Sequence, residues 1–236
     1  MAPANDHSQK AAISDDTLVE AWINHEREFR IYSDRVYKRS FRPEEYRVYG
    51  GRPYVPPLGF ERLQNEAACL DFVRSKTAIP VPDILEAFSD NGSFVLVTKR
   101  LSGVKMNELS PEDQAVVMKE VEAHVDTLRG LRSNRTGGPS GIVCPPRRAT
   151  QGFPSGTTWS ARVTTEQGFV FCHGDLSQSN IIVDPHTLKI EGIIDWEYGG
   201  FWPAFFESPY FRDSRPSGAQ FKDTTENAPL VDFLRQ

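Results

Sequence analysis

The segment that most constrains the fold is residues 169–197, FVFCHGDLSQSNIIVDPHTLKIEGIIDWE. Short apolar runs alternate there with polar loops: FVFC predicts a buried strand, HGDLSQSN predicts a loop, and IIV and LKIEGII predict two more strands. The intervening DPHT contains strong turn formers, so the last two strands are expected to pair as a hairpin. Because a hairpin returns the chain to its starting point, the residue before its first strand and the residue after its second strand must lie close together.

This hairpin is expected to gather three polar side chains. Asn180 directly precedes the outgoing strand, Asp195 follows the returning strand, and Asp175 lies upstream on the same loop. Taken singly, each could be a cap or a loop hydrogen-bonding group. Together, one carboxylate and one amide supply oxygen ligands of the kind that Mg²⁺ prefers, with water and phosphate completing the octahedron. Asp175 would then be free to accept a proton from an attacking hydroxyl, which is the division of labour in phosphoryl transfer.

At these residues the chain resembles a known family. HGDLSQSN followed by IIDWE is similar to the catalytic and metal-binding loops of the aminoglycoside phosphotransferases, small-molecule kinases that share the protein-kinase-like fold. The protein-kinase pattern H-R-D-x-x-x-x-N has similar spacing, but Gly174 replaces its Arg, and DWE stands where D-F-G would be. The resemblance implies that Asp175 is the catalytic base, that His173 supports the catalytic loop, and that Asn180 and Asp195 bind Mg²⁺.

The resemblance also implies the fold. We expect an α+β, two-lobed protein-kinase-like fold, although 236 residues could also form one large domain. The small N-terminal lobe would be mostly β with one main helix, and the larger lobe mostly α with the catalytic hairpin. The expected division is an N-terminal extension with a helix over residues 1–30, a small lobe over 31–101, and a large lobe with a truncated C-terminus over 102–236.

Local patterns predict the elements of these lobes. TLVEAWINHEREF has apolar residues near helical spacing and predicts a leading helix, whereas RIYSDRVYKRS alternates like a strand pair. ERLQNEAACLDFVRSK predicts an amphipathic helix, and DILEAFSDNGSFVLVTKRL predicts two strands joined by a turn at Asp-Asn-Gly. SPEDQAVVMKEVEAHVDTLRGLRS predicts a long helix with Ser110 as its N-cap.

The family resemblance nominates an ATP site in the small lobe. Glu66, on the amphipathic helix, would pair with the phosphate-binding lysine, for which SDRVYKRS nominates Lys38. Arg47 competes for this role, because YRVYGG could be the corresponding strand instead. The segment FVLVTKRLSG resembles the linker whose backbone holds adenine, which places five residues in contact range: Val97, Thr98, Lys99, Arg100 and Leu101.

Departures from the family pattern leave two hypotheses open. No glycine precedes Lys38, where a glycine-rich loop should cover the phosphates, and the segment after the metal loop is short. The first hypothesis is an ATP- and Mg²⁺-dependent phosphotransferase that acts on a hydroxyl of an aminoglycoside or a choline-like molecule. The alternative is a degenerate pseudokinase that binds ligands without turnover. A protein kinase is disfavoured because no A-P-E motif follows Asp195.

The composition excludes several other classes of protein. The formal net charge of −5 gives no overall attraction to nucleic acid. No apolar run reaches the roughly 20 residues that a membrane-spanning helix needs, and the first residues lack the apolar centre of a secretory signal. We therefore expect a cytoplasmic protein with a small-molecule hydroxyl acceptor and no nucleic-acid or membrane partner. The sequence does not predict its oligomeric state.

Overall fold

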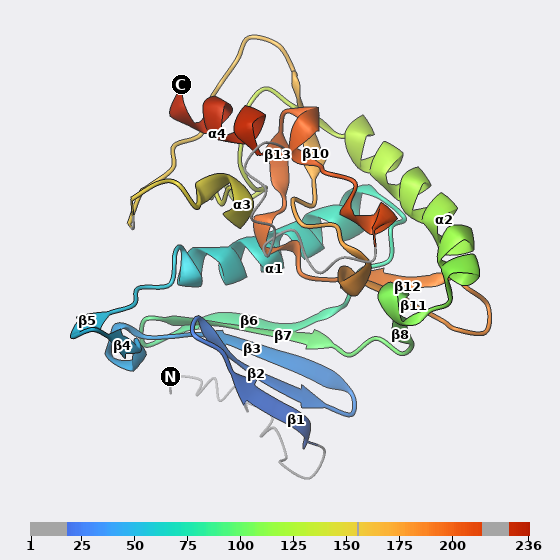
Figure 1. The fold of residues 1–236 in the computed structure, drawn as a ribbon, viewed down its shortest axis with the longest axis horizontal. Helices are drawn as coiled ribbons and strands as arrows, with labels where there is room; N and C mark the ends of the chain where they lie inside the picture. Colours follow the sequence, from blue (N-terminus) through green and yellow to red (C-terminus); the bar gives the residue numbers. More distant parts are fainter. Residues whose placement is uncertain (1–17, 155, 214–226) are drawn as a thin grey trace, which may run out of the picture.

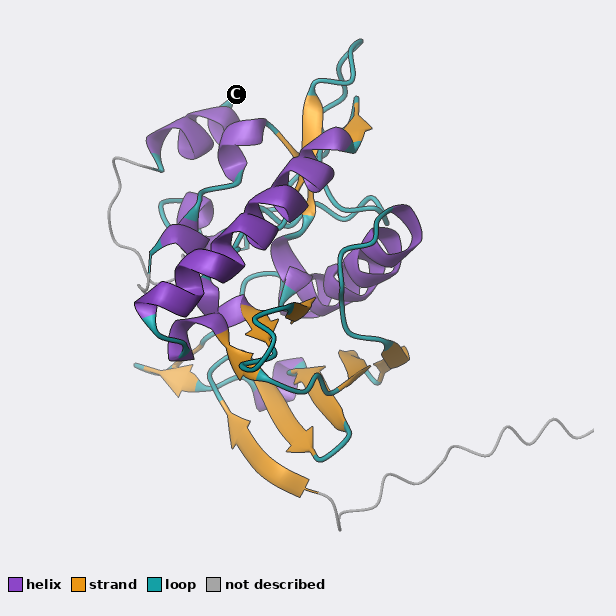
Figure 2. Ribbon diagram, turned by 90° about the vertical axis from the view of Figure 1, so that its right-hand side faces the viewer, coloured by secondary structure: helices purple, strands orange, loops and turns teal. Residues whose placement is uncertain are grey.

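The computed structural model describes residues 18–154, 156–213 and 227–236. Its main sheet is antiparallel with the strand order β1-β2-β3-β7-β6 (Figure 1). These strands are Leu18–Ile23 (β1), Arg27–Tyr32 (β2), Arg35–Ser40 (β3), Ile84–Asp90 (β6) and Ser93–Lys99 (β7). The long helix α1, Gly59–Lys76, lies along one face of the sheet, and the other α-helices lie beyond α1 on the same side (Figures 1 and 2).

The leading helix predicted from TLVEAWINHEREF is wrong, because these residues form β1 and β2. Asn24 builds the turn between the strands: its Oδ1 accepts hydrogen bonds from the backbone N–H groups of Glu26, at 2.7 Å, and Arg27, at 2.8 Å. Trp22 and Phe29 then stack across the strand pair, with ring centroids 4.9 Å apart. The described part of the expected extension is thus part of the main sheet, and residues 1–17 lie outside the described residues.

Most of the other predicted elements are confirmed. RIYSDRVYKRS forms the β2–β3 strand pair, and the β6–β7 turn has positive φ angles at Asn91 (46°) and Gly92 (87°). The helix α2, Pro111–Gly130, begins after Ser110, whose Oγ accepts a hydrogen bond from the Asp113 N–H at 3.2 Å.

The hairpin predicted from residues 181–194 is also present. Its strands are Ile181–Val183 (β11) and Ile190–Ile193 (β12), and Val104–Lys105 (β8) adds a third strand. A second small sheet places Phe169–Cys172 (β10) between Arg132–Ser133 (β9) and Gly200–Trp202 (β13). The other β-strands and α-helices are short: Val48–Tyr49 (β4), Arg52–Pro53 (β5), Arg147–Thr150 (α3) and Ala228–Arg235 (α4). Among the described residues beyond 101, the helical content therefore comes mainly from α2.

One apolar cluster joins the main sheet to the hairpin. Leu70 of α1, Leu96 of β7, Val121 of α2 and Ile193 of β12 are buried in the same cluster. The strands and helices that carry the predicted site residues are thus held by shared packing. No helix in residues 18–154, 156–213 or 227–236 is both long and apolar enough to cross a membrane.

Candidate active site

The hairpin brings the predicted catalytic and metal-binding residues together. Because Ile181 pairs with Ile193, Asn180 and Asp195 flank the same open end, and the Ile194 N–H donates to the Asn180 carbonyl at 2.9 Å. The Asn180 side chain turns back onto the upstream loop, where its Nδ2 donates to the Asp175 carbonyl at 2.9 Å. Asp175, Asn180 and Asp195 therefore form one connected site, as the hairpin argument predicted.

A buried lysine links this site to the small lobe. Lys38 of β3 places its Nζ 2.6 Å from Glu66 Oε1 of α1, and the same Nζ donates to Asp195 Oδ1. The competing residue, Arg47, is exposed and donates to the Ile23 carbonyl at 3.4 Å. The geometry therefore favours Lys38 over Arg47 as the residue that would meet phosphate.

Lys38, Glu66 and Asp195 form a charged triad in which charged neighbours shift the pKa of each residue. Burial opposes the charge on Lys38, but Asp195 and Glu66 outweigh it and raise the pKa of the ammonium above its ordinary value. Burial acts against the charge on Asp195 too, yet the Lys38 ammonium holds the pKa of this carboxyl below its usual range. Burial raises the pKa of Glu66, against the opposing pull of Lys38. One ammonium thus faces two carboxyl groups, an arrangement that a further cation would complete.

The side chain of Asp195 is accessible from solvent. Its backbone adopts the left-handed conformation, with φ 64° and ψ 49°, which Asp tolerates better than most residues. Its side chain is 43% exposed, whereas those of Lys38 and Glu66 are 9% and 3% exposed. Asp195 is therefore the member of the triad that solvent, or a metal ion, can reach.

The donor set fits Mg²⁺ better than a metal held by protein alone. In the described ranges, no group of three or more His, Cys, Asp or Glu side chains could hold a metal ion. Asp195 supplies an ionised carboxylate, and Asn180 keeps its Oδ1 available while its Nδ2 is bonded. Two protein oxygens with phosphate and water are sufficient for Mg²⁺, which is usually bound through few protein ligands.

His173 supports the loop and is not positioned for proton transfer. Its Nε2 lies 2.9 Å from the Ile194 carbonyl, and its Nδ1 accepts from the Asp175 N–H at 3.2 Å. Burial lowers the pKa of the imidazole to about 4, so the ring is neutral and carries its proton on Nε2. Both ring nitrogens are thus used in fixing Asp175 beside the Asp195 strand.

The backbone and a close neighbour explain why glycine stands at position 174, where protein kinases have arginine. Gly174 has a φ of +84°, a conformation that favours glycine. A Cβ atom at this position would lie 3.0 Å from both the Cβ and the carbonyl oxygen of Tyr198. The contact with Tyr198 and the backbone conformation therefore both disfavour an arginine at this position.

Two buried polar side chains that sequence reasoning missed, Glu207 and Arg148, hold the start of the 173–180 loop. Glu207 Oε2 accepts hydrogen bonds from the N–H groups of His173 and Gly174, and burial raises the pKa of Glu207 to about 7. Arg148 is 4% exposed and donates to the carbonyls of Gly174 and Phe206. An acidic residue inside the aromatic run FWPAFFESPYF was the available signal for Glu207.

The proposed adenine segment lies at the end of β7. Val97 and Thr98 are buried, Lys99 and Arg100 are exposed, and Leu101 is half-buried. The Lys99 N–H donates to the Asp83 carbonyl at 2.8 Å, and the Arg100 N–H donates to the Asp34 carbonyl at 2.9 Å. Adenine would therefore have to use other backbone groups of this segment than these two amides.

Further charged residues meet beside the triad at the β1–β2 turn. Glu26 pairs with Arg62 of α1, and Arg27 pairs with Glu197, two residues beyond Asp195. Arg62 also contacts Glu197, at 3.3 Å, and Arg147 of α3 pairs with Glu26. Sequence reasoning did not identify this network. Its signal was Arg62, a charged residue four positions before Glu66 on the buried face of the amphipathic helix.

Glu26 gives this network a defined pH dependence. Although burial raises its pKa, Arg62, Arg147 and Arg27 together lower it from 4.5 to about 2. A carboxyl with a depressed pKa in the folded state stabilises above its unfolded value, and the effect is lost as the pH falls through the folded value. We expect Glu26→Gln to be destabilised by up to about 3 kcal/mol at neutral pH, taking 1.36 kcal/mol per pKa unit.

The deficit of Glu26→Gln should shrink between pH 4.5 and pH 2, the window that separates the two pKa values. Urea unfolding of both proteins at pH 7, 4.5 and 3 measures it. A deficit that stays constant over this range would show that Glu26 is not held as an ion by its arginines.

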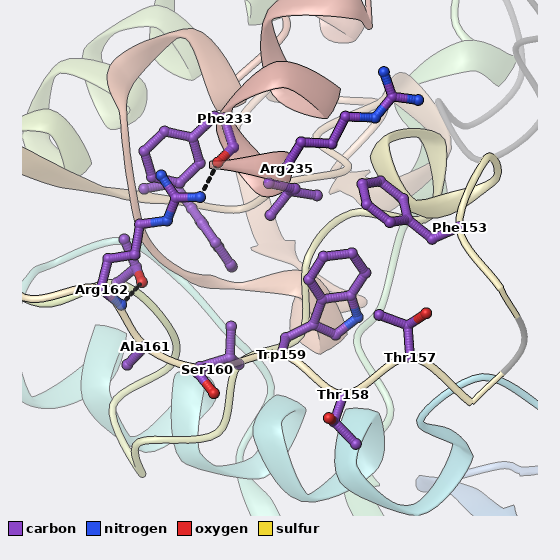
Figure 3. A pocket seen from close by; sticks show the side chains of 13 residues that line it. Phe153, Thr157, Thr158, Trp159, Ser160, Ala161, Arg162, Phe233 and Arg235 are labelled. Atoms are coloured by element: carbon purple, nitrogen blue, oxygen red, sulfur yellow. Dashed lines mark hydrogen bonds between the residues drawn. The ribbon is translucent and has the colours of Figure 1, made fainter.

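A separate pocket lies away from these residues. It has a volume of about 490 Å³ and lies between the 153–162 loop and α4 (Figure 3). Phe153 and Trp159 meet edge to face in it, with centroids 4.9 Å apart, and Arg162 donates to the Phe233 carbonyl. None of the predicted catalytic, nucleotide-binding or metal-binding residues is among the described residues that line this pocket.

Comparison with known proteins finds sequence similarity to one family around this site. The model of the phosphotransferase enzyme family matches residues 155–208, which contain the catalytic loop and the hairpin. Aminoglycoside 3'-phosphotransferase of Streptomyces ribosidificus is 29% identical over 165 residues, which cover 61% of this chain and 62% of that protein. Over about three fifths of its length the chain is similar in sequence to aminoglycoside 3'-phosphotransferases. The same enzyme of Streptomyces fradiae is 28% identical over 167 residues, with 61% of each protein covered.

Solved aminoglycoside phosphotransferases share the fold. The enzyme APH(3'')-Id from Streptomyces rimosus matches with a TM-score of 0.56 and 16% identity, over 91% of this chain and 83% of that one. Aminoglycoside 3'-phosphotransferase of type VIII matches over 92% of both chains, with a TM-score of 0.51 and 17% identity. The expected kinase-like fold is thereby confirmed. In sequence, the chain spans about three fifths of the length of the curated aminoglycoside phosphotransferases that it matches.

Proposed function

We propose that this protein is an ATP- and Mg²⁺-dependent phosphotransferase that moves the γ-phosphate to a hydroxyl of a small molecule. The observation that carries the proposal is the position of Lys38, which bridges Glu66 of the small lobe and Asp195 of the metal loop. A buried ammonium held between carboxylates beside an open hairpin end is suited to the charge of a triphosphate. We also retain residue 102 as the proposed boundary between the two lobes.

The nucleotide and the metal fit the residues present. When bound, Mg-ATP supplies the phosphoryl group and part of the charge neutralisation. Asp195 and the Oδ1 of Asn180 would hold the metal, and Lys38 would contact phosphate. Solved relatives support a nucleotide: one APH(4)-Ia structure is a ternary complex with AMP-PNP and hygromycin B, and a 2'-phosphotransferase structure is a GDP complex.

The catalytic loop fits the role of base for Asp175. The neutral His173 ring and the Glu207 carboxyl fix the backbone on either side of Gly174. Fixing the backbone orients the Asp175 carboxylate before substrate arrives, so that less ordering is required at the transition state. Asp175 would orient the acceptor hydroxyl and accept its proton as the bond to phosphorus forms.

The acceptor is proposed from the relatives. These relatives are named as aminoglycoside phosphotransferases, so an amino sugar is the first candidate for the acceptor. A choline-like cation is the second. A cationic acceptor also suits a site rich in carboxylates. We place the reaction in the cytoplasm, with no nucleic-acid or membrane partner.

Thermal unfolding with added ligand tests the nucleotide site. A ligand that binds only the folded state stabilises it by about 2.7 kcal/mol at a concentration of 100 Kd. We expect ATP with Mg²⁺ to raise the melting temperature more than either alone, and Asp195→Ala to lose the metal-dependent part. Glu191→Ala, which removes an exposed acid from β12 of the same hairpin, is the matched control and should respond like the wild type. A wild-type protein that responds to none of these ligands would favour the degenerate pseudokinase.

A further inference from the structure

Two buried residues of opposite charge at the β1–β2 turn, Glu26 and Arg27, form ion pairs with residues from distant segments of the chain. Glu26 lies in the turn and Arg27 is the first residue of β2, and they are only 7% and 4% exposed. The carboxylate of Glu26 lies 2.6 Å from Arg62 Nη2 and also accepts from Arg147, while the guanidinium of Arg27 pairs with Glu197. Turn residues of this kind are usually exposed, so their burial requires a specific partner surface.

The register of the sheet puts this turn beside the phosphate-binding lysine. In the β2–β3 pair, Phe29 lies opposite Lys38 and Arg27 lies opposite Ser40. Residues directly opposite one another project to the same face, so Arg27 and Lys38 are diagonal neighbours on one face of the sheet. Each sends its cation to the segment after β12: Lys38 to Asp195, and Arg27 to Glu197.

Glu197, the partner of Arg27, is also held by contacts from α1. Arg62 holds Glu197 from α1 at 3.3 Å, and Asn65 Nδ2 donates to the carbonyls of Glu197 and Gly199 at 3.0 and 2.9 Å. A displacement of Arg27 would therefore remove one of the contacts that hold Glu197, two residues after Asp195.

We propose that Arg27 is a positioning residue for the nucleotide site, which latches the β1–β2 turn to Glu197 and so holds both the turn and the Asp195 loop in place. This inference rests on the proposed function. The latch accounts for the absence of glycine before Lys38: ion pairs and the Asn24 side chain fix this turn, so it need not wrap the phosphates through a flexible backbone. Glu26 strengthens the same latch through Arg62.

The test compares Mg²⁺-dependent ATP binding by calorimetry in Arg27→Met, Arg27→Lys and Glu197→Gln. Groups that orient metal ligands indirectly typically change metal affinity by 10- to 100-fold, so we expect about 10- to 100-fold weaker binding in Arg27→Met and in Glu197→Gln. Arg27→Lys keeps the charge and should recover most of the affinity. The double variant Arg27→Met with Glu197→Gln should bind no more weakly than the weaker single variant, because both remove one contact.

Arg30→Met is the matched control. It lies on the same strand but on the opposite face, and its side chain, 44% exposed, pairs with Glu28 at 2.7 Å. Binding in Arg30→Met should equal that of the wild type. The latch would be overturned if Arg27→Met bound ATP as tightly as the wild type. It would also be overturned if Arg27→Lys bound ATP as weakly as Arg27→Met.

The latch and the proposed function fail in different ways. If the wild type itself does not bind ATP with Mg²⁺, the proposed function is wrong, whereas wild-type binding with no loss in the variants contradicts the latch alone. If Arg27→Met does not fold, Arg27→Lys and Glu197→Gln still decide the question from both sides of the contact.

Discussion

Replacing Asp175 with Asn is expected to lower kcat for phosphate transfer by about 10²- to 10⁴-fold, the usual contribution of a positioned general base. Asn has the same shape but cannot accept the proton of the acceptor hydroxyl. The backbone of this residue, whose N–H donates to His173 Nδ1 and whose carbonyl accepts from Asn180 Nδ2, can make the same hydrogen bonds in the variant. Nucleotide affinity should therefore change little, so that the loss appears in kcat.

Steady-state kinetics together with calorimetry separate these quantities for Asp175→Asn. Asp184→Asn is a suitable control, because Asp184 accepts from the His186 N–H at the closed end of the same hairpin, where Asn can accept equally well. An unchanged kcat in Asp175→Asn would mean that another group acts as the base. A parallel loss of ATP binding would mean that Asp175 acts mainly through the metal or the nucleotide.

Replacing Lys38 with Met should remove both nucleotide binding and a large part of the stability. The substitution leaves Glu66, which is 2% exposed, without its cation and close to a second carboxylate. Breaking a buried ion pair from one side typically costs about 3–5 kcal/mol. Because the Asp195 side chain is 43% exposed and can be solvated, we expect a value near the lower end of this range.

A second substitution separates the two effects of Lys38. The double variant Lys38→Met with Glu66→Gln removes the uncompensated charge, so it should regain most of the stability while still failing to bind ATP. Denaturant unfolding gives the first quantity and calorimetry the second. Lys76→Met, at the exposed end of α1, controls for the loss of a lysine. Should the double variant bind ATP normally, Lys38 is a structural residue and the phosphate contact lies elsewhere.

The stability deficit of Lys38→Met should also depend on pH. Burial raises the pKa of Glu66 above its ordinary value, so the folded state of this carboxyl favours the protonated form. A group with a raised folded pKa loses stability as the pH rises from its unfolded value through its folded one. Without Lys38 this pKa rises further, and the deficit should shrink as the solution is acidified.

Local patterns predicted the parts of the site that lie close together in the sequence. The hairpin followed from two apolar runs around a turn, and it placed Asn180 and Asp195 together without any long-range information. The long helices followed from their apolar periodicity and, for α2, from the Ser110 cap. What the sequence could not supply was the left-handed backbone at Asp195, because nothing in IIDWE marks a positive φ.

The missed residues lie where distant segments meet. Arg27 and Glu197 pair across 170 positions of the sequence, which no local periodicity reports. The same limit explains the wrong helix: apolar residues of β1 and β2 fall near helical spacing, but pairing in a sheet outweighs that weak preference. Arg62 and Asn65 could have been found from the helix alone, since polar residues on the buried face of an amphipathic helix need partners.

The most direct test of the central claim is the transfer of labelled γ-phosphate from ATP, with Mg²⁺, to a panel of aminoglycosides and hydroxylated amines. The wild type should label at least one acceptor, and Asp175→Asn should label it at a rate lower by about two orders of magnitude or more. If the wild type binds ATP with Mg²⁺ but labels no acceptor, or if Asp175→Asn labels the acceptor as fast as the wild type, this chain does not transfer phosphate by the proposed route.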